Sequence, residues 1–240
     1  MPCKTCAATP RVYVIPLRGQ IEHGLASFIS RGLREAAEAR ADAVIIDIDT
    51  PGGYVDAALK MRDAIISSEV RTIAYVNSRA WSAGALIAIA CDDIGMKIGS
   101  SMGAAETRPK EEKYISAVRA EFEATAELRN RDPIVAGAMV DADVEIPGLI
   151  ERGKILTLTA TMAEDLGFVE YKIRNMDELL EQSDLTGALL VEVKQTSAEW
   201  FARLLTNQLA AEILLTLGLI GLAIELFTPG FGIPGTVGIV

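Results

Sequence analysis

The amino-acid sequence predicts an α/β fold with a largely parallel sheet, followed by a C-terminal transmembrane segment. Short β-branched runs alternate with single helical segments, a pattern typical of right-handed crossovers between parallel strands. The last part of the chain, Leu204–Val240, is almost wholly apolar. With 240 residues, the chain has enough length for one well-buried core and an appendage.

Four short apolar runs in the first half are predicted strands: Val12–Leu17, Ala43–Ile48, Thr72–Val76 and Gly95–Ile98. Between the first two, Ala26–Ala39 carries apolar residues such as Ile29 and Leu33 at helical spacing. Val55–Ser67 repeats this pattern before the third strand. Strands joined by single helices therefore predict a βαβ arrangement.

The second half is predicted from looser signals. Met102–Lys110 is rich in Gly, Ala and charge, which indicates a mobile loop, and Glu112–Arg129 has the spacing of a long amphipathic helix. Asp132 and Pro133 form a favourable helix start. The remaining expected elements are a capped helix at Thr157–Leu166, a strand at Phe168–Lys172, a helix at Asp177–Gln182, a strand at Leu189–Val193 and a connection at Ala198–Leu205.

Composition excludes several classes of protein. Hydrophobic residues make up 50% of the chain and charged residues 23%, which favours a globular fold over disorder. The formal net charge of −10, with no basic stripe, argues against a nucleic-acid partner. No cofactor is expected, and a tail without metal is favoured over a zinc site at Cys3 and Cys6, since no second pair of ligands accompanies them. Cys91 is expected to be a packing residue.

The C-terminal region is predicted to start a membrane-spanning region. Ile213–Ile224 carries no charge, and with its flanks it approaches the ~20 residues that span hydrocarbon, interrupted by Glu212 and Glu225. A buried core helix is the alternative. Because the apolar pattern resumes at Thr236–Val240 and stops there, further membrane segments are expected to follow. The expected organisation is a tail at residues 1–11, without a signal peptide, a domain at 12–200 and a membrane region from 201–240.

Two turns carry the candidate chemistry, each where a predicted strand gives way to a helix: Asp49–Gly53 and Trp81–Ala85. The two glycines of Pro51-Gly52-Gly53 allow bare N–H groups to approach a developing oxyanion, although such a turn also occurs without function. Ser82 has small neighbours and a helix N-terminus beside it, so it is a candidate nucleophile or a simple N-cap. Both turns follow neighbouring strands, where ligands bind in open α/β sheets.

A serine nucleophile needs a base. The sole histidine, His23, is expected to be a surface residue at a helix start. A lysine with a depressed pKa replaces histidine in some hydrolases. Lys113 is the preferred candidate, with Lys110 and Lys97 as alternatives, and a solvated helix-end cation is the other interpretation of Lys113.

The segments Asp49–Asp56, Trp81–Ala85, Glu112–Arg119 and Glu225–Gly235 together resemble the NfeD family of membrane-bound Clp-class serine proteases, relatives of signal peptide peptidase A. The resemblance implies a Clp/crotonase-like ββα superhelix. It also implies a Ser-Lys dyad of Ser82 and Lys113, with an oxyanion hole from the N–H groups of Gly53 and Ala83. Lys110 stays open as the base, because the loop Gly103–Lys110 is shorter than the family leads us to expect.

The same resemblance implies cleavage of apolar segments of stomatin-like membrane proteins by a dimer or larger homo-oligomer. It also implies a catalytic domain on the extracytoplasmic side of the cell membrane. Two other functions remain open at this point: a crotonase-like enzyme acting on acyl-CoA, and a non-catalytic membrane-anchored scaffold for partner membrane proteins.

Overall fold

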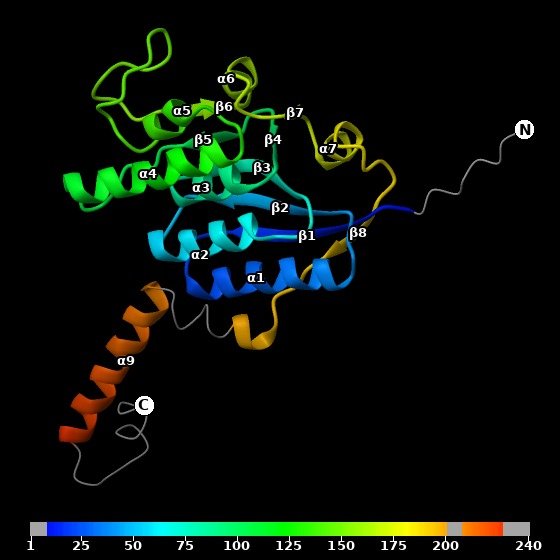
Figure 1. Ribbon diagram of the computed structural model, residues 1–240. Helices are drawn as coiled ribbons and strands as arrows, with labels where there is room; N and C mark the ends of the chain where they lie inside the picture. The colour runs from blue at the N-terminus through cyan, green and yellow to red at the C-terminus, as the bar shows by residue number, and fades with distance from the viewer. Residues whose placement is uncertain (1–8, 201–207, 228–240) are drawn as a thin grey trace, which may run out of the picture. The chain divides into compact units, whose positions relative to one another are not determined.

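The computed structural model describes residues 9–200 and 208–227, and it divides the chain into two compact units, Met1–Lys194 and Gln195–Val240. The first unit is built on one eight-stranded sheet (Figure 1). Its strands run in the order β6-β5-β3-β2-β1-β8, and β4 pairs with both β3 and β7. All pairs are parallel except β5 with β6. The predicted α/β fold with a largely parallel sheet is confirmed.

The strands are β1 (Arg11–Arg18), β2 (Ala43–Thr50), β3 (Thr72–Trp81), β4 (Asp93–Lys97), β5 (Ser101–Gly103), β6 (Thr157–Thr159), β7 (Tyr171–Ile173) and β8 (Leu189–Glu192). The helices of this unit are α1 (His23–Glu38), α2 (Val55–Ile66), α3 (Ala83–Ala90), α4 (Glu112–Leu128), α5 (Pro133–Ala138), α6 (Ala160–Asp165) and α7 (Met176–Gln182).

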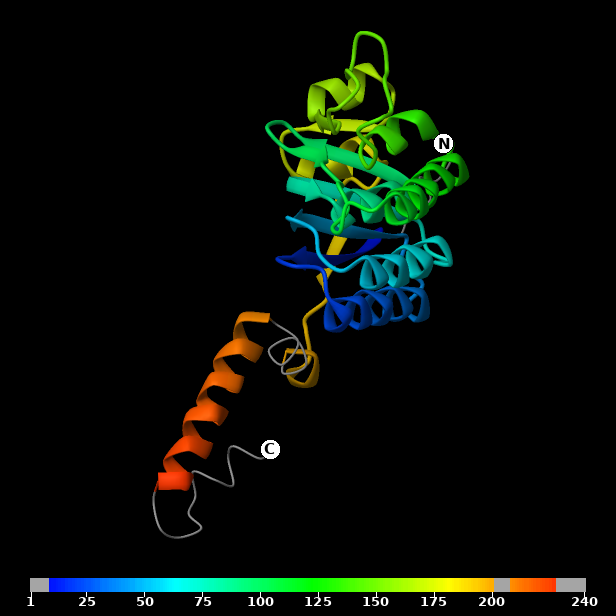
Figure 2. The same cartoon turned by 90° about the vertical axis from the view of Figure 1, so that its left-hand side faces the viewer.

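The central strands are apolar because helices cover both faces of the sheet. On one face, the side chains of α1, α2 and α3 join the larger core cluster with Ile46 and Ile48 of β2. On the other, Leu179 of α7 packs with Ile45 and Ile73. Figure 2 shows α1, α2 and α4 lying side by side on one side of the strands.

The short helix α3 is buried on every side, and all eight of its residues belong to the core. Its small residues permit close packing, since a Cβ added at Gly84 would lie 2.5 Å from the Thr50 Cγ2 atom. This contact places the start of α3 directly beside the end of β2. The two turns singled out in the sequence therefore meet at one edge of the sheet.

Several predicted boundaries are wrong. Strand β3 continues past Val76 to Trp81, so that the strand runs directly into Ser82. The helix predicted at Thr157–Leu166 is a strand followed by a shorter helix, because Thr159 pairs with Ser101 and its hydroxyl then caps α6 by accepting from the Met162 N–H. The predicted mobile loop begins with β5, which pairs with β3. Strand β7 lies at Tyr171–Ile173, later than the predicted strand.

The second unit contains α9 (Gln208–Phe227). Within the described residues, we find no helix with the length and apolar character needed to cross a membrane, so the predicted transmembrane segment is not confirmed there. The charge-free run Ile213–Ile224 is shorter than the ~20 residues that a span requires. Residues 1–8, 201–207 and 228–240 lie outside the described residues, and with them Cys3, Cys6 and the last apolar segment.

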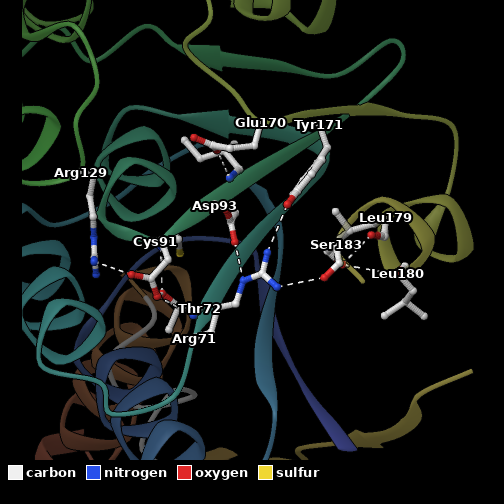
Figure 3. A network of polar contacts seen from close by, with 12 residues as sticks. Arg71, Thr72, Cys91, Asp93, Arg129, Glu170, Tyr171, Leu179, Leu180 and Ser183 are labelled. Carbon is white, nitrogen blue, oxygen red and sulfur yellow. Dashed lines mark hydrogen bonds and ion pairs between the residues drawn. The ribbon is translucent and has the colours of Figure 1, made fainter. Parts of the chain in front are cut away.

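A polar network ties together the amino ends of β3 and β4. The Arg71 guanidinium donates to Asp93 at 2.7 Å, to the Ser183 carbonyl at 2.9 Å and to the Tyr171 hydroxyl at 3.2 Å (Figure 3). The buried Arg131 donates to Glu170 at 2.8 Å. Arg131 also donates to the main-chain carbonyls of Ile89, Cys91 and Asp92. This end of the sheet is therefore fixed by charged hydrogen bonds to side chains and carbonyls alike.

Candidate functional site

A cavity of about 570 Å³ lies where β2 and β3 end. Gly53 and Ser82 lie on one side of it, and the segment 104–108 lies on another. Its apolar walls come from several parts of the chain: Val55, Ala58, Leu86, Val118, Phe122 and Ile155. A concave, mostly apolar site with a few polar groups is typical of ligand pockets.

The glycine turn after β2 is held in a single conformation by the residues around it. The Thr50 hydroxyl donates to the Gly19 carbonyl at 2.6 Å and accepts from the Gly52 N–H at 3.0 Å. Gly52 has φ +105°, and a Cβ added to it would lie 2.6 Å from the Ser82 Cβ. A Cβ at Gly53 would lie 2.1 Å from the Ile21 carbonyl oxygen. Both positions therefore require glycine, one of them because the turn touches Ser82.

Ser82 is held in a strained backbone conformation. Its φ is 52° and its ψ is −122°, a region that non-glycine residues rarely occupy, and strain of this kind gathers at functional sites. Its N–H donates to the Gly103 carbonyl at 2.7 Å, which fixes the backbone. Ser82 occupies the N-cap position of α3, yet its side chain makes no capping hydrogen bond. The simple N-cap interpretation therefore leaves its hydroxyl unexplained.

Two main-chain N–H groups face the space beside Ser82. The Ile21 N–H donates to the Gly52 carbonyl and the Tyr54 N–H donates to the Ile21 carbonyl, so the Gly53 N–H points away from β1. Ala83 is the first residue of α3, where a helix leaves its N–H groups unpaired. Neither N–H bonds to any other group in the described part of the chain, and both residues line the cavity. This pairing of donors has the chemistry of an oxyanion hole.

The candidate lysines lie elsewhere. Lys113 Nζ lies 3.2 Å from Glu111 and 4.7 Å from the Tyr114 ring centre, and its side chain is 69% exposed. Lys110 pairs with Glu106 at 2.5 Å. Lys97 donates to the Asn77 side chain at 3.2 Å. Among the residues that the structure describes, no lysine lines the cavity, so Ser82, Gly53 and Ala83 are brought together and Lys113 is not.

The other nucleophile and base candidates are accounted for. Cys91 is fully buried, and burial raises the pKa of its thiol to about 12, so the reactive thiolate is scarce at neutral pH. His23 begins α1 with a half-exposed ring, as predicted, and its Nε2 lies 3.1 Å from Asp56. Its ring stacks on Tyr54 and is absent from the cavity lining. Ser82 is thus the candidate nucleophile that the geometry supports.

The segment 104–108 adds groups that the sequence did not single out. The Ala104 N–H donates to the carbonyl of Leu156, just before β6, and the Ala105 N–H to the carbonyl of Met139, just after α5, so both bonds anchor the segment. Thr107 is buried, and its hydroxyl is without a hydrogen-bond partner in the described structure. Arg108 also lines the cavity. From its Gly, Ala and charged residues, the sequence predicted only a loop here. No motif or spacing in the sequence pointed to Thr107 or Arg108.

The chain is similar to known proteins over most of its length. Residues 11–193 match the family described as NfeD1b, N-terminal domain, and residues 209–240 match the NfeD integral membrane domain. The chain is 43% identical over 235 residues to the membrane protein NfeD1b of Bacillus subtilis, and 30% identical over 259 aligned positions to the membrane-bound protease PH1510 of Pyrococcus horikoshii. These alignments cover 95% of this chain but 54% and 55% of the relatives, so the chain spans about half their length.

Solved structures show the same fold. A serine-to-alanine mutant of the 1510-N membrane-bound stomatin-specific protease has a TM-score of 0.69 at 25% identity, covering 79% of this chain and 100% of that one. A lysine-to-alanine mutant of the same protease, in complex with a substrate peptide, has a TM-score of 0.69 at 24% identity, covering 81% of this chain and 97% of that one. ClpP1 from Listeria monocytogenes shares the fold at a TM-score of 0.55 and 20% identity, over 69% of this chain and 94% of that one.

The largely parallel sheet therefore resembles the fold of the 1510-N protease and of ClpP1. With the N-terminal domain and part of the membrane domain matched in order along one sequence, this chain belongs to the NfeD family.

Proposed function

We propose that this chain is the protease part of a membrane-associated serine endopeptidase in which Ser82 is the nucleophile. One observation carries the proposal: a strained serine with a non-capping side chain lies beside two unpaired N–H groups in a partly apolar cavity. The names of the relatives support it, since PH1510 is described as a membrane-bound protease and its mutants replace a serine and a lysine.

The proposed reaction runs through an acyl-enzyme. A neutral amine takes the Ser82 proton, and Oγ attacks the peptide carbonyl carbon. The N–H groups of Gly53 and Ala83 donate to the resulting oxyanion, the amine returns the proton to the leaving nitrogen, and water then hydrolyses the ester. Removing one oxyanion donor in such a site costs roughly a hundredfold or more in kcat.

Lys113 is the proposed base, with Lys110 as the alternative. Both belong to the stretch from Glu106 to Lys113, which begins within the cavity-lining segment 104–108, and both are paired with glutamates of that stretch. For either amine to reach Ser82, this stretch has to rearrange when substrate binds. In that arrangement the amine leaves its glutamate and enters a partly apolar cavity.

The proposed substrates are apolar segments of stomatin-like membrane proteins, because the 1510-N structures are described as a stomatin-specific protease and one contains a substrate peptide. Membrane association is proposed from the match to the NfeD integral membrane domain. A homodimer or larger assembly, with the protease domain on the extracytoplasmic side, completes the proposal.

A non-catalytic scaffold remains the second candidate, and one observation favours it: in the described residues, every candidate lysine is held away from Ser82. The NfeD1b relative is described only as a membrane protein. In this alternative the cavity would bind a partner without cleaving it.

The test is covalent labelling of the full chain in detergent with a fluorophosphonate, together with cleavage of a fluorogenic apolar peptide. We expect labelling and cleavage in the wild type, and loss of both by at least about 10³-fold in Ser82→Ala. Ser30→Ala is the matched control, since its hydroxyl donates to the Ala26 carbonyl within α1. Of Lys113→Ala and Lys110→Ala, only the variant that removes the base should abolish turnover. Full cleavage by Ser82→Ala would refute the proposal, and binding without cleavage would support the scaffold.

A further inference from the structure

The charges around the Ser82 cavity are unequal. Two charged side chains line it, Glu106 and Arg108. The Glu106 carboxylate lies 2.5 Å from Lys110 Nζ, which neutralises it. The Arg108 guanidinium forms no hydrogen bond or ion pair with any residue that the structure describes. Arg108 is therefore the charged lining residue without a counter-ion among the described residues, and it is exposed at the cavity's edge to solvent.

The main chain adds to this positive field. The unpaired N–H groups of Gly53 and Ala83 face the same space, and α3 presents its N-terminus there. The protein carries a formal net charge of −10, so this cavity differs in sign from the molecule as a whole. This local field would attract an anionic group on a ligand. Repulsion of that group by the acidic surface elsewhere is weak, because dissolved salt screens exposed charges.

The remaining walls are apolar. Leu86, Val118 and Phe122 come from α3 and α4, and Val55 and Ala58 come from α2. A ligand that fits these walls is apolar over most of its surface. Arginine recognises carboxylates through two parallel N–H donors, a geometry that lysine lacks.

We propose that Arg108 determines specificity by binding a carboxylate that accompanies the apolar residues of the substrate peptide. This inference rests on the proposed peptide substrate, and it adds a charged recognition element to it. Two sources supply the same chemistry: an Asp or Glu side chain near the scissile bond, or the free C-terminal carboxylate of a peptide.

The experiment compares peptides that differ by one charge. Apolar fluorogenic peptides carry Glu, Gln or Lys in turn at each of the four positions on either side of the scissile bond, and each is made with a free and an amidated C-terminus. With the full chain, we expect kcat/KM to favour Glu over Gln at one position, or the free over the amidated terminus, by about tenfold at low salt. The first pattern assigns the anion to a side chain and the second to the terminus.

Variants of Arg108 then test the residue. Arg108→Gln should bring the ratio close to one, Arg108→Lys should keep part of it, and Arg108→Glu should make the Lys-containing peptide the better substrate. Arg34→Gln is the matched control, because Arg34 is an exposed arginine of α1 that does not line this cavity. A ratio near one in the wild type at every position, or a ratio unchanged in Arg108→Gln, would overturn the proposal.

Binding separates this inference from the proposed function. The affinity of the same peptides for Ser82→Ala, measured by fluorescence anisotropy, does not depend on turnover. If the wild type cleaves nothing but Ser82→Ala binds the carboxylate-bearing peptide about tenfold more tightly through Arg108, the proposed function fails and the recognition stands. If cleavage proceeds with no charge preference in either assay, or if no peptide binds, the recognition fails.

Discussion

The two ends of the central sheet differ in how many of their polar groups have hydrogen-bond partners. At the amino ends of β3 and β4, the Arg71 guanidinium donates to a carboxylate, a carbonyl and a phenol hydroxyl (Figure 3). The two terminal nitrogens of Arg131 donate to Glu170 and to three main-chain carbonyls, and its buried Nε lacks a partner among the described residues. At the carboxyl ends of β2 and β3, the Gly53 and Ala83 N–H groups and the Thr107 hydroxyl bond to nothing else that the structure describes. Satisfied groups stabilise the fold, whereas unsatisfied groups beside a cavity are available to a ligand.

This contrast indicates that the amino ends of β3 and β4 mainly stabilise the fold, whereas the carboxyl ends of β2 and β3 are available for binding. A buried unpaired group costs roughly 1–3 kcal/mol, so a protein retains several of them in one place only when something else is gained. The following three experiments sharpen or break the contrast, from the largest expected effect to the smallest.

The largest effect on stability is expected at the amino ends of β3 and β4. Arg131→Met removes a side chain that is 2% exposed, takes the Arg131 donor away from three carbonyls and leaves Glu170 with the Ile94 N–H alone. We expect the free energy of unfolding to fall by about 3 kcal/mol, measured by urea denaturation followed by circular dichroism. Arg174→Met is the control: the Arg174 side chain is 76% exposed in its ion pair with Glu178, so its loss should lower the free energy of unfolding far less.

Labelling of Ser82 by a fluorophosphonate under native conditions should stay unchanged in Arg131→Met, since the network lies at the far end of the strands. An equal loss of stability in Arg131→Met and Arg174→Met would show that the buried Arg131 network stabilises the fold no more than an exposed ion pair does.

The second experiment concerns Thr107. Thr107→Val keeps the shape of the side chain and removes an unpaired buried hydroxyl, so we expect the free energy of unfolding to rise by about 1 kcal/mol. Thr125→Val is the matched control, because the buried Thr125 hydroxyl donates to the Glu121 carbonyl and accepts from Arg62. That control should lose about 1 kcal/mol. A loss of stability in Thr107→Val would mean that its hydroxyl is hydrogen-bonded in solution.

The smallest effect tests which lysine is the base. Glu111→Gln frees Lys113, and Glu106→Gln frees Lys110. Because exposed ion pairs are worth at most about 1 kcal/mol, we expect kcat/KM to rise by no more than about fivefold, and only in the variant that frees the base. Glu151→Gln frees Lys154 outside this stretch and should change nothing. An unchanged kcat/KM in both variants would show that these ion pairs do not limit how often the lysine reaches Ser82.

The sequence predicted the sheet and the two glycine-flanked turns well, because burial on both faces imposes apolar runs and a close approach to Ser82 imposes glycine. It misplaced the elements after Gly103, where three-residue strands such as β6 carry no periodic signal. The sequence left Lys113 open as a base or as a solvated helix-end cation, because a lysine at a helix start has the same local sequence whether it faces solvent or a cavity, and the structure places it in solvent. Thr107 and Arg108 were missed for the same reason: their importance comes from what surrounds them in space.

The hydrogen bond from the Ser82 N–H to the Gly103 carbonyl joins the proposed nucleophile to the last residue of β5, directly before the cavity-lining segment 104–108. A displacement of this segment is therefore transmitted to the Ser82 backbone through this one hydrogen bond. A compound bound beneath residues 104–108 would shift Ser82 without contacting its side chain. The junction after β5 therefore suits inhibitors that do not react with the serine.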